Sequence, residues 1–156
     1  MDDPDPETDT DWSVLQATLA PGQVMVTATE AQPWGQALLT QKHVQFADET
    51  AEHNGADTGP NPHELVLMAL GACTAITVRM YAARKGWAID KLDVRLSFRK
   101  APAGAPTPAR EQIERQIEIE GPLDAEQRAR LFAVAEKCPI HKLLTGGVDI
   151  HSELVA

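Results

Sequence analysis

Two cysteines are the residues of this sequence with the most distinctive chemistry. Cys73 and Cys138 are its only cysteines, and 65 residues separate them. Two thiols that can meet support disulfide-forming redox chemistry, provided that an oxidant can reach one of them. The alternative is a structural role, because free cysteine is among the most buried residue types and usually behaves as a small hydrophobe.

The residues around both cysteines favour chemistry. Cys73 lies among small residues, Gly71-Ala72-Cys73-Thr74-Ala75, which leave room beside the sulfur for a partner or a substrate. Cys138 precedes Pro139, where a helix is predicted to break. The backbone amides of residues 139–141 are therefore expected to point toward the Cys138 sulfur, with His141 close by. Reactive thiols occupy such positions.

Other kinds of functional site find little support. Cys138-x-x-His141 is the one close Cys/His spacing, and zinc sites normally show clearer pairs, so we expect neither a metal nor another cofactor. The sequence contains no Walker loop, dinucleotide-binding glycine pattern or nucleophilic serine elbow. The net charge of −9 argues against nucleic-acid binding, which requires a basic face.

A long helix is expected to position Cys73. The segment from His63 to Lys85 contains no proline, with Asn61 as the predicted N-cap, Pro62 at the first helical position and Gly86 after the end. Residues 65–70 are apolar on every side, which predicts a helix enclosed by other structure. One chain of 156 residues supplies too little covering for such a helix, so we expect a homodimer.

The remaining patterns predict an α+β fold. Short apolar stretches at 14–19, 23–29, 37–39 and 44–46 indicate a small antiparallel sheet, and alternation at 92–98 and 113–119 indicates two further strands. Asp124-x-x-Gln127 predicts a capping box that opens a helix running to about Lys137, and residues 148–155 predict a final strand. The proline-rich stretch 101–108 is predicted to be a loose connection. Grouped strands, rather than regular strand–helix alternation, are typical of α+β proteins.

The N-terminal residues differ from the rest. Six of the 23 acidic side chains lie among residues 1–11. We predict a disordered acidic tail over residues 1–12 and a single domain over 13–156. No secretory signal pattern is present, and the longest weakly polar stretch, 65–78, is shorter than the roughly 20 residues of a membrane span. A cytoplasmic protein with no membrane association and with reduced cysteines is therefore expected.

Two motifs resemble those of a known family. The segment 59–75, which contains Asn61-Pro62 and Gly71-Ala72-Cys73, resembles the central-helix motif of the OsmC/Ohr family, and residues 136–140 resemble its second cysteine motif. The resemblance extends from about residue 30 to 155. It implies an OsmC-like domain with antiparallel sheets around a long buried central helix, in an intertwined homodimer with active sites at the subunit interface. The run 79–87 resembles one OsmC-like subgroup, distinct from the peroxidase branches.

The resemblance also implies a reaction. In the peroxidase branches the first cysteine attacks a peroxide and the second forms a disulfide with it, which an external dithiol reduces. By position, Cys73 would be the attacking cysteine and Cys138 the resolving one. Organic hydroperoxides would be preferred to hydrogen peroxide, because the family's pocket is apolar.

The chain departs from those branches at two supporting residues. They carry an arginine in the N-terminal sheet, whereas no arginine precedes Arg79 here. They carry a glutamate directly after the proline of the Asn-Pro motif, where this chain has His63, with Glu64 one position late. The candidates to support the thiols are Lys42, His43, His63 and Glu64, with Arg95 and Arg99 as more distant candidates.

The function predicted from the sequence is thiol-dependent reduction of organic hydroperoxides through a Cys73/Cys138 disulfide cycle. The missing arginine and glutamate leave two alternatives open. One is a non-catalytic dimeric domain that binds a small apolar ligand at the interface. The other is a thiol sensor whose disulfide alters the binding of a partner.

Overall fold

The computed structural model describes residues 10–29, 33–99, 104 and 111–155. They form two compact units, which divide between Leu65 and Val66 and are described in turn. The predicted acidic tail lies mostly outside the described residues, as does most of the predicted loose connection at 101–108. The domain boundary at residue 13 stays a prediction.

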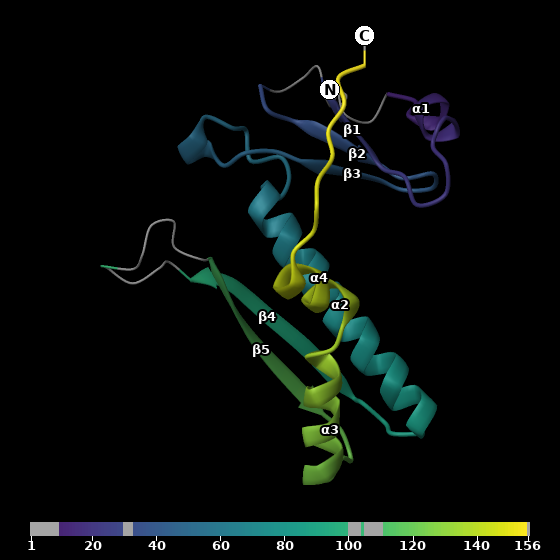
Figure 1. Cartoon of the computed structure of the whole chain (residues 1–156), viewed down its shortest axis with the longest axis vertical. Helices are drawn as coiled ribbons and strands as arrows, with labels where there is room; N and C mark the ends of the chain where they lie inside the picture. Colours follow the sequence, from purple (N-terminus) through teal and green to yellow (C-terminus); the bar gives the residue numbers. More distant parts are fainter. Residues whose placement is uncertain (1–9, 30–32, 100–103, 105–110, 156) are drawn as a thin grey trace, which may run out of the picture. The chain divides into compact units, whose positions relative to one another are not determined.

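The first unit contains a three-stranded antiparallel sheet in the order β1-β2-β3 (Figure 1). The strands are β1 (Met25–Ala28), β2 (Gln36–Leu39) and β3 (Val44–Ala47), which confirms the sheet predicted from the apolar stretches. The central strand carries the buried residues Ala37 and Leu39, which pack with Leu19. A short 3-10 helix, η1 (Ala51–His53), follows β3.

The prediction of a strand over residues 14–19 was wrong, because α1 (Ser13–Ala17) is a helix. Trp12, Leu15 and Leu19 all contribute to the core of the first unit. Their spacing of three and then four residues follows the helical period rather than the alternation of a strand. Asp11 accepts a hydrogen bond from the Ser13 backbone amide at 2.9 Å, which satisfies a donor at the start of the helix.

A buried carboxylate organises the loop after β3. Asp48 is only 2% exposed, and its oxygens accept hydrogen bonds from the backbone amides of Glu49, Ala56 and Thr58 and from the Thr58 hydroxyl. Burial raises the pKa of Asp48, but these hydrogen bonds to the charged form outweigh it and hold the pKa below its ordinary value.

We therefore expect Asp48→Asn to destabilise the protein at neutral pH, since an amide group would place its own N–H donors against the donors of the loop. A carboxyl group whose pKa is depressed by folding stabilises the native state above its unfolded pKa of about 3.9. That contribution is lost as the pH falls through the lower folded value. Urea midpoints at pH 7 and pH 3 measure the effect. The difference in urea midpoint between wild type and Asp48→Asn should narrow at pH 3. Glu52 is exposed, so Glu52→Gln should show no comparable difference from wild type at pH 7.

The central helix α2 (Pro62–Lys85) begins and ends as predicted. The Asn61 side chain accepts a hydrogen bond from the Glu64 amide at 3.0 Å, and the Glu64 carboxylate accepts one from the Asn61 amide at 2.9 Å. This reciprocal pair is a capping box. Gly86 follows the last turn with a φ of 68°, a conformation that favours glycine.

The second unit packs α2 against a hairpin and a shorter helix (Figure 1). The hairpin pairs β4 (Lys91–Arg99) with β5 (Gln112–Glu120) in antiparallel register, and α3 (Ala125–Ala135) and α4 (Pro139–Gly146) follow. Val78, Ala82, Leu131 and Ala135 form the core between α2 and α3. The Asp124/Gln127 capping box is confirmed. The fold is therefore α+β, with antiparallel sheets and a long central helix.

The predicted strand over residues 148–155 was wrong, because this segment forms neither helix nor strand. Strand structure requires a backbone hydrogen-bond ladder with a neighbour. Within the described chain the segment pairs with neither sheet, and its apolar side chains are exposed, from Val148 at 65% to Leu154 at 99%.

The helix α2 is less covered than its composition predicts. Met68, Ile76 and Met80 are 56%, 58% and 61% exposed in the single chain. By length and composition alone α2 is also the one helix among the described residues that could cross a membrane, with a mean hydropathy of 1.7 over the most apolar window. The core helices of globular proteins meet the same criterion, so this is weak evidence for a membrane span.

Candidate functional site

Cys138 lies in the second unit, at the junction between α3 and α4. It is fully buried and forms the N-cap of α4, where the chain leaves α3 and turns at Pro139. Its sulfur accepts a hydrogen bond from the backbone amide of His141 at 3.4 Å. Of the amides of residues 139–141 that were predicted to approach the sulfur, the structure confirms that of His141, and Pro139 carries no N–H to donate.

Thr74, on the neighbouring helix α2, contacts the same sulfur. Its side chain is fully buried, and its hydroxyl oxygen lies 3.7 Å from the Cys138 sulfur and 2.8 Å from the Leu70 carbonyl oxygen. One hydroxyl proton can be donated to the carbonyl or to the sulfur, but not to both. When Thr74 donates to Leu70, its oxygen can accept the proton of the Cys138 thiol. When Cys138 is a thiolate, the Thr74 hydroxyl can donate to the sulfur instead.

A buried arginine completes this cluster. Arg115 on β5 is only 10% exposed and donates from Nη1 to the Thr74 hydroxyl oxygen at 2.8 Å and to the Ala135 carbonyl oxygen at 3.4 Å. Its Nη2 lies 3.5 Å from a carboxylate oxygen of Glu136, a side chain that is 52% exposed. Arg115 thus places a positive charge two contacts from the Cys138 sulfur. We call Thr74, Arg115 and Cys138 the thiol cluster.

Cys73 adjoins this cluster through the backbone of α2. It is half-buried and directly precedes Thr74. Consecutive helical residues point about 100° apart, so Cys73 faces a different side of α2 from the one that contacts Cys138. Both thiols are free. Gly71 lies two residues earlier, and a Cβ there would meet the Leu96 side chain of β4 at 2.9 Å, so the glycine allows α2 to pack closely on the hairpin.

Four of the other candidates from the sequence lie in the first unit. Lys42 and His43 form the turn between β2 and β3, where both backbone amides donate to the Thr40 hydroxyl. His63 and Glu64 lie in the first turn of α2, and Glu64 serves in the capping box. Their support of the thiols stays a prediction.

Arg95 and Arg99 lie on the exposed face of β4. Arg99 pairs with Glu114 at 2.8 Å and Arg95 pairs with Glu118 at 3.6 Å. The Arg95 side chain is 68% exposed, and the Arg99 side chain is 63% exposed. Such surface ion pairs contribute little to stability, and both guanidinium groups already have carboxylate partners. They are ordinary surface residues.

Sequence reasoning missed Arg115, although a signal was present. Ile113, Ile117 and Ile119 mark the inward face of β5, and Arg115 takes the position between the first two of them. It pairs with Leu96, on the apolar face of β4. A charged residue in an apolar register requires a buried partner, and here that partner is Thr74.

The cluster has the chemistry of a thiol site rather than a metal site. Among the described residues, no group of three histidine, cysteine or acidic side chains is placed to hold a metal ion. The cluster contains one sulfur, one hydroxyl and one permanent cation. The Thr74 hydroxyl can donate a hydrogen bond to the sulfur or accept one from it, and Arg115 fixes the hydroxyl by donating to its oxygen.

Comparison with known proteins bears on the family of the chain. Residues 55–153, more than half of the chain, match the family model of OsmC-like proteins. The chain belongs to the OsmC family. The match includes both cysteine motifs and the whole thiol cluster of this OsmC-family chain. A search of curated proteins found no match.

Solved structures share the OsmC fold with this chain. An OsmC-like protein from Mycoplasma pneumoniae is 21% identical, with a TM-score of 0.64 over 81% of this chain and 90% of that chain. An organic hydroperoxide resistance protein OsmC from Legionella pneumophila is 18% identical, with a TM-score of 0.59 over 84% and 95%. The organic hydroperoxide resistance protein OhrB of Bacillus subtilis is 22% identical, with a TM-score of 0.54 over 81% and 92%. At these identities the likeness establishes the fold.

Proposed function

We propose that this OsmC-family protein is a thiol-dependent peroxide reductase that acts on organic hydroperoxides. The observation that carries the proposal is the thiol cluster, in which Thr74 contacts the Cys138 sulfur and Arg115 donates to Thr74, on the helix that bears Cys73. The names of the Legionella and Bacillus neighbours, both organic hydroperoxide resistance proteins, support the same class of substrate.

The proposed reaction uses both sulfurs in turn. The Cys73 thiolate attacks the terminal peroxide oxygen, the O–O bond breaks, and the departing alkoxide takes up a proton to form an alcohol. Cys73 is then a sulfenic acid. Cys138 loses its proton and attacks the Cys73 sulfur, so that an S–S bond forms and hydroxide leaves as water. An external dithiol returns two electrons by thiol–disulfide exchange, in the cytoplasm, where such reductants are present.

The surroundings of Cys73 support an organic substrate. Val66, Ala69, Cys73, Ile76 and Met80 follow one another at spacings of three and four residues, so they form one stripe along α2. We call this set the apolar stripe. It is exposed in the single chain, with Val66 at 38% and Ile76 at 58%. An alkyl hydroperoxide would contact apolar side chains on both sides of the attacking sulfur.

The apolar stripe also supports a homodimer. An exposed row of apolar side chains on one helix favours burial against a partner, and obligate dimers bury such faces. A second copy of the chain would cover the stripe and place Cys73 at the subunit interface. This arrangement would also account for the apolar composition of α2.

We expect Ile76→Asp to convert the dimer to monomers, because a charge buried in an apolar interface is strongly unfavourable. Sedimentation velocity of the reduced protein measures the result, with at least a tenfold weaker association expected, on the order of 1.4 kcal/mol or more. Gln116→Asp, on the exposed face of β5, should leave the association unchanged. A wild-type protein that sediments as a monomer would contradict the dimer.

One observation favours a second function. The Cys138 sulfur is fully buried and hydrogen-bonded, as a structural cysteine would be. In that case the protein would be a dimeric domain that binds a small apolar ligand along the apolar stripe without turnover. Stopped-flow mixing of the reduced protein with cumene hydroperoxide separates the two functions. Slow thiol loss at the same rate in wild type and Cys73→Ser would favour the binding domain.

A further inference from the structure

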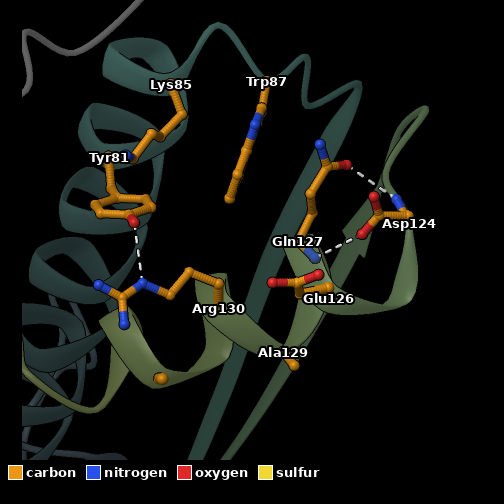
Figure 2. Close-up of a pocket in the computed structure, with 9 residues that line it drawn as sticks. Tyr81, Lys85, Trp87, Asp124, Glu126, Gln127, Ala129 and Arg130 are labelled. Carbon is orange, nitrogen blue, oxygen red and sulfur yellow. Dashed lines mark hydrogen bonds between the residues drawn. The ribbon is translucent and has the colours of Figure 1, made fainter.

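A groove lies between the last turn of α2 and the beginning of α3, apart from the thiol cluster. It encloses about 760 Å³, within the range of small-molecule sites. Tyr81, Lys85 and Trp87 line one side, and Glu126, Gln127 and Arg130 line the other (Figure 2). Tyr81 is seven residues from Thr74, or roughly 10 Å along the helix. All of these residues belong to the second unit.

An aromatic pair forms one wall of the groove. The rings of Tyr81 and Trp87 meet edge to face, with their centroids 5.9 Å apart. Both side chains are half-buried, so part of each ring remains open to the groove. Such a wall provides a flat apolar contact for another ring.

Positive charges gather at the Tyr81 end. The charged groups of Arg84, Lys85 and Arg130 lie 5.9, 5.8 and 5.6 Å from the centre of the Tyr81 ring. None of the ion pairs found among the described residues involves any of these three cations. Like charges so close together repel one another, and cation–π contact offsets that repulsion only in part. An anion at this end would relieve the repulsion.

The hydrogen bonds at this end leave donors in excess. Arg130 Nε donates to the Tyr81 phenol oxygen at 2.9 Å, so the phenol O–H is free to donate in another direction (Figure 2). Within the described part of the chain, the phenol proton, the Nη groups of Arg130 and the Lys85 ammonium donate to no acceptor. The hydrogen bond from Arg130, together with the positive charges of Lys85 and Arg84, lowers the pKa of Tyr81, in keeping with an environment that favours negative charge.

The far end of the groove is occupied by groups that do not compete for an anion. Asp124 is engaged in the capping box of α3, where its oxygen accepts from the Gln127 amide at 2.7 Å. Gln127 in turn accepts from the Asp124 amide at 3.0 Å. Glu126 also lines the groove, and it takes part in none of the ion pairs found among the described residues.

We propose that this groove binds a small aromatic anion, with its charged oxygens on Tyr81, Lys85 and Arg130 and its ring against Trp87. The chemistry that it recognises is a carboxylate, sulfonate or phosphate carried on a planar ring. The site stands on its own geometry and does not depend on peroxide reduction.

The test uses 2-naphthoate as probe, with its uncharged analogue 2-naphthamide and inorganic phosphate for comparison. Two-dimensional ¹H–¹⁵N spectra of the full-length protein follow the indole N–H of Trp87, assigned with Trp12→Phe and Trp34→Phe. We expect 2-naphthoate to shift this signal saturably, and 2-naphthamide to bind at least about tenfold more weakly, as expected for loss of a charge-assisted contact.

Variants separate the site from non-specific binding. Arg130→Gln and, independently, Lys85→Gln should each weaken the binding of 2-naphthoate about tenfold or more. Arg95→Gln, a matched loss of an exposed arginine on β4, should leave the affinity unchanged. No saturable shift at Trp87, or equal affinities in all variants, would overturn the proposal. If phosphate bound as tightly as 2-naphthoate, the proposed contact between the ligand ring and Trp87 would be overturned.

Discussion

Replacement of Cys73 by serine should lower the rate of cumene hydroperoxide reduction at least about 1,000-fold, because a serine hydroxyl is not a nucleophile near neutral pH. Stopped-flow measurement of thiol loss in the reduced protein under excess peroxide gives the rate. The apolar stripe around Cys73 should be intact in this variant, so its association state serves as a check on folding.

Cys138→Ser is the matched control for that experiment. It removes the other sulfur but keeps the proposed nucleophile, so it should consume about one peroxide per chain and then stop with Cys73 as a sulfenic acid. Dimedone labelling detects that acid. A Cys73→Ser protein that reacts at the wild-type rate, while Cys138→Ser does not, would mean that the two sulfurs have the opposite roles.

Replacement of Arg115 by glutamine should slow the second step, the attack of Cys138 on the Cys73 sulfenic acid, by about 10- to 100-fold. This range is at or below the effect of removing one preorganised donor from an active site. Arg115 donates to the Thr74 hydroxyl, which contacts the Cys138 sulfur, so the guanidinium fixes that hydroxyl and adds a positive charge near the sulfur during the attack. Arg115 is therefore a positioning residue.

The lifetime of the sulfenic acid measures this effect, because peroxide attack by Cys73 should change less than about threefold in the same variant, a difference of under 1 kcal/mol. Arg115→Lys restores the charge and should recover part of the rate. Arg99→Gln removes an exposed arginine of β4 and should change neither step. Equal lifetimes in wild type and Arg115→Gln would show that Arg115 is structural only, and thermal unfolding of both variants checks that they fold.

Arg115 bears on how this chain departs from the peroxidase pattern of its family. The chain has no arginine before Arg79. Arg115 lies on β5 in the second unit and donates to Thr74, which contacts the sulfur of the second cysteine rather than the first. If it acts as proposed, the cation supports the resolving step, and the peroxide-attacking step relies on the surroundings of Cys73 in the assembled protein.

The elements that the sequence predicted correctly are those whose signals are local. The capping residues Asn61 and Asp124 sit at the starts of α2 and α3, and Gly86 ends α2, because each satisfies backbone groups within a few residues of itself. The alternating apolar residues of β4 and β5 also specified their inward faces, since side chains alternate along any strand.

The two wrong predictions each depended on a partner that the local sequence does not contain. Residues 148–155 alternate as a strand would, but a strand exists only where a neighbour completes its hydrogen bonds. In the stretch 14–19, apolar and β-branched content indicated a strand, but the sheet of the first unit contacts residues at helical spacing. Tertiary packing decided both segments.

The sequence by itself determined the two sulfurs, the helix that carries Cys73, and the break that turns the His141 backbone amide toward Cys138. These follow from residue type and spacing along the chain, which the fold cannot change. Only the tertiary structure decided that Thr74 and Arg115 belong to the site. They come from α2 and β5, 41 residues apart, and their link is a 2.8 Å hydrogen bond within the packed second unit. A buried charge needs a partner in space, and distance along the chain does not reveal which residue that partner is.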